Sequence, residues 1–66
     1  MIKYSCTMSL GEDIYYVTLV ADNEQQARDM AFAEANKGRL RDWSVRILES
    51  GVEGPARTLA SGHRDA

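Results

Sequence analysis

The chain has 66 residues, of which 44% are hydrophobic and 27% charged, and its formal net charge is −2. A chain of this length forms one small domain with a thin core, and its composition is that of a folded protein rather than a disordered one. No apolar run reaches the roughly 18 residues of a membrane span, and no secretory signal is recognisable. Cys6 is the only cysteine, so an internal disulfide is excluded. We therefore expect a cytoplasmic protein, without a membrane contact.

Charge is distributed unevenly along the chain. Residues 1–36 carry a net charge of −4, residues 37–46 carry +3, and the remaining residues carry −1. This distribution predicts an acidic half and a small basic corner. Residues 36–46 mix basic and aromatic side chains, but the strand pattern there buries Trp43. Because a nucleic-acid ligand requires a broad basic surface, we expect no direct contact with nucleic acid.

Two strands open the chain. Residues 2–10 alternate apolar and polar side chains without an error, the period of a half-buried strand. Residues 11–13 supply turn chemistry, and residues 14–21 form a second run rich in β-branched and aromatic residues, so a β-hairpin is expected. The second run is apolar on both faces. We expect it to be a central strand, or to be covered on its second face by a partner.

A helix is predicted over residues 21–38. Asp22 or Asn23 can cap its N-terminus, Gln25 stands three residues after Asp22 in a capping-box-like spacing, and Gly38 is placed for a C-terminal cap. Small and flexible side chains form the stripe that faces the sheet, namely Ala27, Met30, Ala31 and Ala35. Phe32 lies off the middle of that stripe, so it either wraps around the sheet edge or stands exposed.

A third strand is predicted over residues 42–50, with Trp43, Val45 and Ile47 on its buried face. Residues 56–60 offer at most a short fourth strand, pairing with the third as an edge. The expected fold is α+β, a three- to four-stranded antiparallel sheet with one helix packed on one face, in the order ββαβ with an optional last β. Residues 1–61 form the single domain, and residues 62–66 are expected to be a flexible tail.

The chain contains no recognisable catalytic or metal-binding constellation. Cys6 belongs to the buried face of the first strand whereas His63 lies near the end of the chain, so we interpret Cys6 as a core thiol rather than a nucleophile. One cysteine and one histidine are too few for a zinc site, and no phosphate-binding loop is present. We expect no enzyme activity, no metal and no cofactor.

The remaining candidate is a surface that binds a protein partner. Scattered carboxylates can steer association with a basic protein, and exposed aromatic side chains can anchor it. The alternative interpretation is that the carboxylates are solvated turn and cap residues and that the tyrosine face supports a homodimer or is merely exposed. The candidate partner-binding residues are Glu12, Asp13, Tyr16, Asp22, Glu24, Asp29 and Phe32.

The stretches YYVTLVADNEQQARDMA and WSVRILESG, in this strand and helix order, resemble small ββαβ proteins of phages and mobile elements, in particular anti-CRISPR inhibitors of type I systems. The resemblance covers residues 2–50. It implies a non-enzymatic inhibitor that binds a subunit of a type I CRISPR surveillance complex (Cascade) through an acidic surface and blocks binding of target DNA. The basic segment 37–46 departs from a uniformly acidic DNA mimic, which leaves site-specific steric blocking open. The alternative function is a small homodimeric structural or regulatory module of a phage or mobile element, joined along an edge strand or the Tyr16 face.

Overall fold

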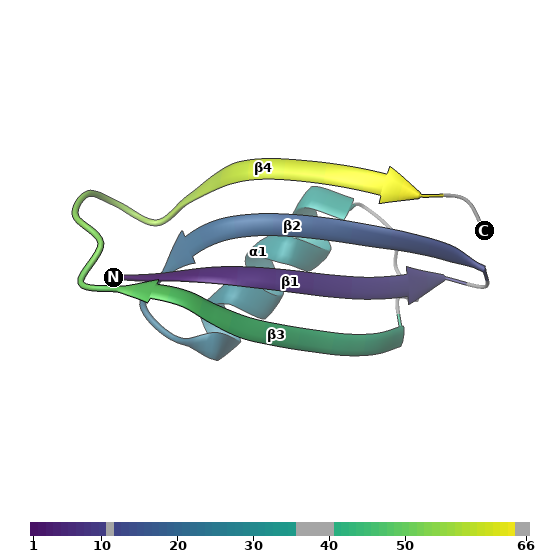
Figure 1. The fold of residues 1–66 in the computed structure, drawn as a ribbon, viewed down its shortest axis with the longest axis horizontal. Helices are drawn as coiled ribbons and strands as arrows, with labels where there is room; N and C mark the ends of the chain where they lie inside the picture. The colour runs from purple at the N-terminus through teal and green to yellow at the C-terminus, as the bar shows by residue number, and fades with distance from the viewer. Residues whose placement is uncertain (11, 36–40, 65–66) are drawn as a thin grey trace.

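The computed structural model describes residues 1–10, 12–35 and 41–64 of the chain. They form one sheet with a single helix behind it (Figure 1). In chain order the elements are β1 (Ile2–Leu10), β2 (Asp13–Ala21), α1 (Glu24–Ala35), β3 (Arg41–Ser50) and β4 (Arg57–Arg64).

The sheet has the strand order β3-β1-β2-β4, and every neighbouring pair is antiparallel. Four antiparallel strands with one helix confirm the predicted α+β fold, and β2 is central as expected. The prediction that the fourth strand pairs with the third is wrong, because β4 pairs with β2 at the opposite edge of the sheet. Residues 62–64, assigned to the tail from the sequence, belong to β4.

A six-residue crossover over residues 51–56 carries the chain from one edge of the sheet to the other. Gly51 and Gly54 adopt positive φ angles of 70° and 95°, which glycine tolerates without steric cost. The backbone N–H of Val52 donates to the carbonyl of Met1 at 2.9 Å, so the crossover is tied to the start of β1. The distance across three strand spacings is about 14 Å, well within reach of six extended residues. This path explains why β4 can bypass β3 and β1.

The inner hairpin supplies most of the core. β1 and β2 pair without a register shift from Ile2 opposite Ala21 to Leu10 opposite Asp13, so the apolar sides of the two strands coincide. The thiol of Cys6 is 1% exposed, which confirms its prediction as a core residue. Val20 belongs by alternation to the side of the sheet away from α1, yet it is completely buried. The core cluster consists of Tyr4, Cys6, Met8, Val17, Leu19, Ala21, Ala27 and Ala31.

The start of α1 is fixed by reciprocal capping. The Oδ1 atom of Asn23 accepts a hydrogen bond from the backbone N–H of Gln26 at 2.9 Å, and Gln26 Oε1 accepts one from the backbone N–H of Asp22 at 2.6 Å. Asn23 is therefore the cap, and Gln26 rather than Gln25 completes the motif. The predicted cap at Gly38 lies outside the described residues.

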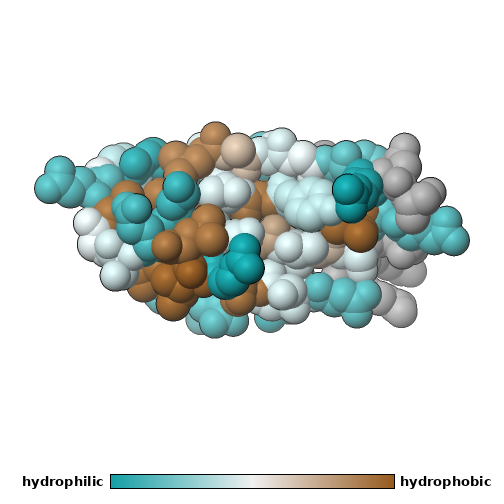
Figure 2. Space-filling model, in the orientation of Figure 1, coloured by the Kyte–Doolittle hydropathy of each residue, from teal (hydrophilic) through white to brown (hydrophobic). Residues whose placement is uncertain are grey.

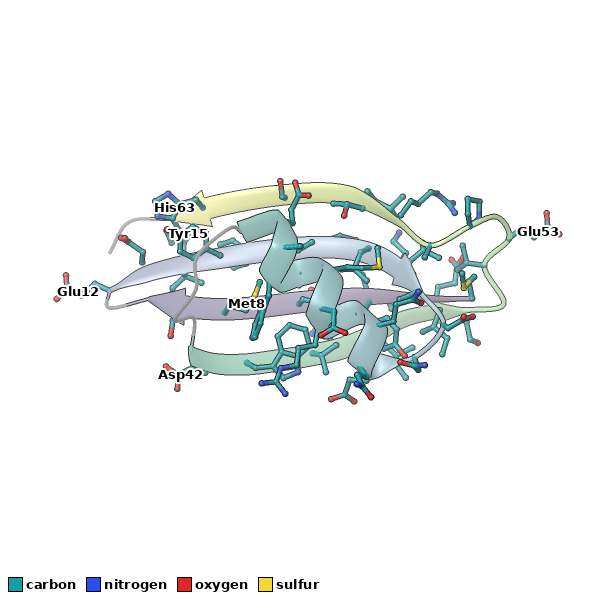
Figure 3. All side chains as sticks on the ribbon, turned by 180° about the vertical axis from the view of Figure 1, so that it is seen from behind. Met8, Glu12, Tyr15, Asp42, Glu53 and His63 are labelled. Carbon is teal, nitrogen blue, oxygen red and sulfur yellow. The ribbon has the colours of Figure 1, made fainter. Side chains whose placement is uncertain are left out.

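Small side chains bring α1 close to the sheet. Ala27 and Ala31 are completely buried, and α1 packs mainly on β2 and β1. Figure 3 views the molecule from the helix side, where α1 crosses the strands obliquely and Met8 lies on the covered face. Phe32 is half-buried and packs against the core, so of its two expected positions the structure favours the packed one.

Both edge strands are irregular. β3 shifts register relative to β1 at Asp42, which has a φ of 52°, and again at Leu48, while β4 shifts relative to β2 at Leu59. Trp43 and Val45 are half-buried and pack against the core, whereas Ile47 is 61% exposed, although the sequence predicts all three on the buried face. β3 has no neighbour on its outer side, so alternation alone does not guarantee burial there.

Candidate functional site

The predicted acidic residues do not form one surface. Glu12 and Asp13 lie at the β1–β2 turn, whereas Asp22 and Glu24 lie beyond the other end of β2. The nine residues of β2 separate the two groups by about 27 Å, close to the full length of the molecule. Figure 3 shows Glu12 at one end of the sheet and Glu53 at the other. A single partner contact therefore engages one acidic group or the other.

The two predicted aromatic residues lie on opposite sides of the sheet. Tyr16 alternates with the buried Val17, points away from α1 and is 39% exposed. Phe32 lies on the helix side. Of the seven candidate residues, the structure brings three together, Glu24, Asp29 and Phe32, in a surface groove.

This groove lies between α1 and β3. We call it the α1–β3 groove, and it has a volume of about 550 Å³. It exists because α1 packs on the two inner strands and crosses them obliquely, which leaves the edge strand β3 incompletely covered. Its lining residues are Glu24, Gln25, Arg28, Asp29, Phe32 and Trp43.

Aromatic contacts form the wall of the groove. The rings of Phe32 and Trp43 meet edge to face, with centroids 5.7 Å apart and an interplanar angle of 86°. The Arg28 guanidinium carbon lies 5.3 Å from the Phe32 ring centroid, a cation–π distance between residues one helical turn apart. The Phe32–Trp43 contact joins α1 to the edge strand β3. The wall of the groove therefore consists of side chains that pack against each other.

The chemistry of the groove suits recognition rather than catalysis. Glu24 and Asp29 provide two carboxylates against the one guanidinium of Arg28, so the lining has a net charge of −1. Aromatic side chains and arginine are enriched at protein interfaces, and carboxylates at a rim select basic partners. The groove can thus accept a side chain that is apolar, cationic or both.

A second cluster holds β4 against β2. The rings of Tyr15 and His63 stack with centroids 4.5 Å apart and an interplanar angle of 9°. Figure 3 shows the two side chains next to each other. The His63 Nε2 atom lies 3.7 Å from Asp13 Oδ1, and the Ser61 hydroxyl donates to Glu34 Oε1 at 3.4 Å. Asp13, which the sequence predicts to be a partner-binding residue of the turn, thus contacts His63 of β4. We assign this cluster to strand attachment, because each contact joins β4 to β2 or α1.

Other chemically useful groups are not assembled into a reactive site. Burial, together with the smaller effect of the nearby negative charge of Glu24, raises the pKa of the Cys6 thiol to about 11. A thiol with such a pKa is protonated and unreactive at neutral pH. Within residues 1–10, 12–35 and 41–64, no three His, Cys, Asp or Glu side chains are grouped to hold a metal ion.

Three groove residues are not among the predicted partner-binding residues. The sequence pattern assigns Gln25 to the helix cap and Trp43 to the core, and Arg28 enters the sequence analysis through its charge alone. The spacing of Arg28 and Phe32, four residues apart on a helix, is the local signal that could have identified the pair. The contact of Phe32 with Trp43 has no comparable signal, because it depends on how α1 and β3 are placed.

Comparison of the chain with known protein families, with curated proteins and with solved structures finds no match. In the part of the chain that the structure describes, no helix has the length and apolar character required to cross a membrane.

Proposed function

We propose that this chain is a non-enzymatic protein-binding inhibitor whose contact surface is the α1–β3 groove. The observation that carries the proposal is the combination of an exposed carboxylate pair, Glu24 and Asp29, with the Phe32–Trp43 wall. Aromatic anchors inside a charged rim are the usual composition of an interface hot spot. The partner side that fits is a basic surface with an apolar or cationic side chain that enters the groove.

The resemblance to anti-CRISPR proteins makes a type I CRISPR surveillance complex the first partner to test. In this proposal the chain acts in the bacterial cytoplasm and covers a basic surface of the complex that receives target DNA. A steric block at one site agrees better with the separation of the acidic residues into two groups than a continuous DNA mimic does.

The alternative function, a homodimeric module, has less physical support. Both edge strands carry register shifts, which oppose edge-to-edge pairing of two copies. The sheet side away from α1 carries several cations, and two such sides would repel each other. We therefore propose a monomer that binds a different protein, and light scattering after size exclusion should report a mass near 7.4 kDa.

The test measures binding to an immobilised type I effector complex. The double charge reversal Glu24→Lys with Asp29→Lys changes the groove, and the matched control Glu12→Lys with Glu53→Lys makes the same change in net charge outside it. We expect the groove variant to bind at least about tenfold more weakly and the control to stay within about twofold of wild type. Far-ultraviolet circular dichroism should show the same fold in both variants.

Two results would contradict the proposal. Equal losses in the two variants would mean that total charge, not the groove, controls binding. Failure of the wild-type chain to bind any type I complex would remove the named partner. In that case a pull-down from a bacterial lysate compares the wild-type chain with Phe32→Ala as bait. Equal capture of protein by the two baits would contradict the groove as the contact surface as well.

A further inference from the structure

A second surface, distinct from the α1–β3 groove, lies on the side of the sheet that α1 does not cover. We call it the helix-free face, and Figure 2 views it directly. Directly paired residues share a face, so the strand registers assign its side chains. They are Lys3, Ser5, Thr7 and Ser9 of β1, Ile14, Tyr16, Thr18 and Val20 of β2, Ser44, Arg46 and Glu49 of β3, and Arg57, Ala60, Gly62 and Arg64 of β4.

The sheet separates the charges of the molecule. Among the described side chains of the helix-free face, four are cationic, Lys3, Arg46, Arg57 and Arg64. Glu49 is the carboxylate that the registers place there, and Asp42 lies at one corner, where its Oδ2 accepts from Ser9. Among the described side chains, the helix side instead holds one arginine, Arg28, against several carboxylates, including Asp13, Glu24, Asp29 and Glu34. The helix-free face therefore has an excess of positive charge although the chain is acidic overall.

Most of this positive charge remains available to a ligand. In the described structure no carboxylate lies within 4 Å of the charged nitrogen atoms of Lys3, Arg46 or Arg64 to form an ion pair. Arg57 is held differently, because its Nη1 donates to the carbonyls of Glu53 at 3.2 Å and Pro55 at 2.8 Å. These bonds to neutral carbonyls orient the guanidinium without neutralising it.

Tyr16 provides a stacking platform on the same face. It lies on the central strand β2 between Thr7 of β1 and Gly62 of β4. A Cβ atom added at Gly62 would meet nothing within 4 Å, so open space adjoins the tyrosine on its β4 side. Arg64 and Arg46 lie on opposite sides of Tyr16, on β4 and β3, at Cα separations of about 8 Å and about 12 Å for regular strand spacings.

We propose that the helix-free face binds single-stranded nucleic acid, with a base stacked on Tyr16 and phosphates near Arg46 and Arg64. Four-stranded sheets bind single strands by base stacking on exposed aromatic side chains combined with backbone contacts to cations. Between the cations the face presents serine, threonine, alanine and glycine together with Ile14 and Val20, and Figure 2 shows hydrophobic side chains gathered on the half nearer the crossover. Serine and alanine are depleted in protein interface cores. Serine and threonine hydroxyls, however, donate hydrogen bonds to phosphate.

This proposal reverses the expectation drawn from the sequence. From the sequence, a nucleic-acid surface was expected only on a basic chain or on a basic segment. The basic segment of this chain is residues 37–46. Of the described cations on the helix-free face, Arg46 belongs to that segment, whereas Lys3, Arg57 and Arg64 come from β1 and β4. The sheet order collects them on one side.

The experiment is fluorescence anisotropy with labelled oligo(dT) and oligo(rU) of about 12 nucleotides, a length within the range that one small domain covers. We expect both single strands to bind at low salt, and a duplex of equal length and polyglutamate to bind at least about tenfold more weakly. Tyr16→Ala should weaken binding by about 5-fold to 100-fold, and Tyr16→Phe should restore it. Arg46→Ala and Arg64→Ala should each reduce the slope of log affinity against log salt by about 0.7.

Arg28→Ala is the matched control, because it removes one arginine from the helix side and should leave oligonucleotide affinity unchanged. The groove variant Glu24→Gln with Asp29→Asn should also bind the oligonucleotide like wild type, which separates this proposal from the protein-binding function. Absence of binding at low salt would overturn the proposal, as would equal losses in Arg28→Ala and Arg46→Ala or an unaffected Tyr16→Ala. Equal binding of polyglutamate would also overturn it, and would assign the face to an acidic protein instead.

Discussion

Raising the pH should destabilise this protein through the buried thiol in its core. Cys6 is 1% exposed and pairs with Val17 on one side and Val45 on the other. Its pKa is raised from 9.0 to about 11, first by burial and then by the charge of Glu24. Because the folded pKa is the higher one, the folded state holds this proton more tightly than the unfolded state. The resulting contribution to stability is complete below about pH 9 and disappears as pH rises through about 11.

The size of the effect follows from the shift of about two pKa units, each equivalent to about 1.4 kcal/mol. The free energy of unfolding should fall by about 1 kcal/mol at pH 10 and by about 3 kcal/mol above pH 11. The core of a domain of this length supplies only about 3 to 5 kcal/mol of unfolding free energy. The expected loss is therefore most of the stability of the protein.

Urea unfolding followed by circular dichroism between pH 7 and pH 11 measures this loss. The matched control is Cys6→Ala, which removes the thiol and keeps every other ionisable side chain. We expect the free energy of unfolding of wild type to fall more steeply than that of Cys6→Ala above pH 9. Parallel pH profiles for the two proteins would refute the assignment of the loss to Cys6.

Three further predictions concern packing and capping. Asn23→Ala should lower the free energy of unfolding by about 1 kcal/mol through loss of the cap, whereas Asn23→Asp should retain it; a thermal melt that leaves Asn23→Ala unchanged would contradict the capping assignment. Ala31→Leu should cost about 1 to 3 kcal/mol in urea unfolding, because the helix sits directly on the sheet there, and a neutral result would mean that α1 is less closely packed. A double-mutant cycle of Phe32→Ala and Trp43→Ala should give a coupling of about 0.5 to 1.5 kcal/mol, and additive losses would show that the edge-to-face contact contributes nothing.

The elements that could be predicted from the sequence are those whose signals are local. The alternation of residues 2–10 required one register, since a one-residue slip would expose the whole apolar set. The start of α1 was predictable to within one residue. Asp22 and Asn23 are both good caps, and the choice between them depends on β2 continuing to Ala21.

The position of β4 could not be predicted in the same way. Residues 57–64 lack an apolar alternation, and every one of them is exposed. Consecutive strands are usually neighbours, which favoured pairing with β3. The contacts that decide otherwise join distant residues, such as Tyr15 with His63 and Val52 with Met1.

The same limit applies to the candidate surfaces. Glu24, Asp29 and Phe32 lie together because one helix carries all three. Trp43 joins them from β3, and the cations of the helix-free face join each other from three strands. Those groupings depend on the order of the strands in the sheet, which no segment of the sequence encodes by itself.

The crossover that sends β4 to the far edge also has a consequence for folding. The β1–β2 hairpin forms from residues that are close in sequence. The second edge of β2 is covered later in folding, because β4 lies about 40 residues further along the chain. During that interval β2, rich in valine, tyrosine and leucine, offers unpaired backbone N–H and carbonyl groups to any other chain. Aggregation during refolding should therefore rise steeply with protein concentration. Deletion of residues 57–64 should leave the edge of β2 exposed in the folded protein as well, so that the variant continues to aggregate after refolding.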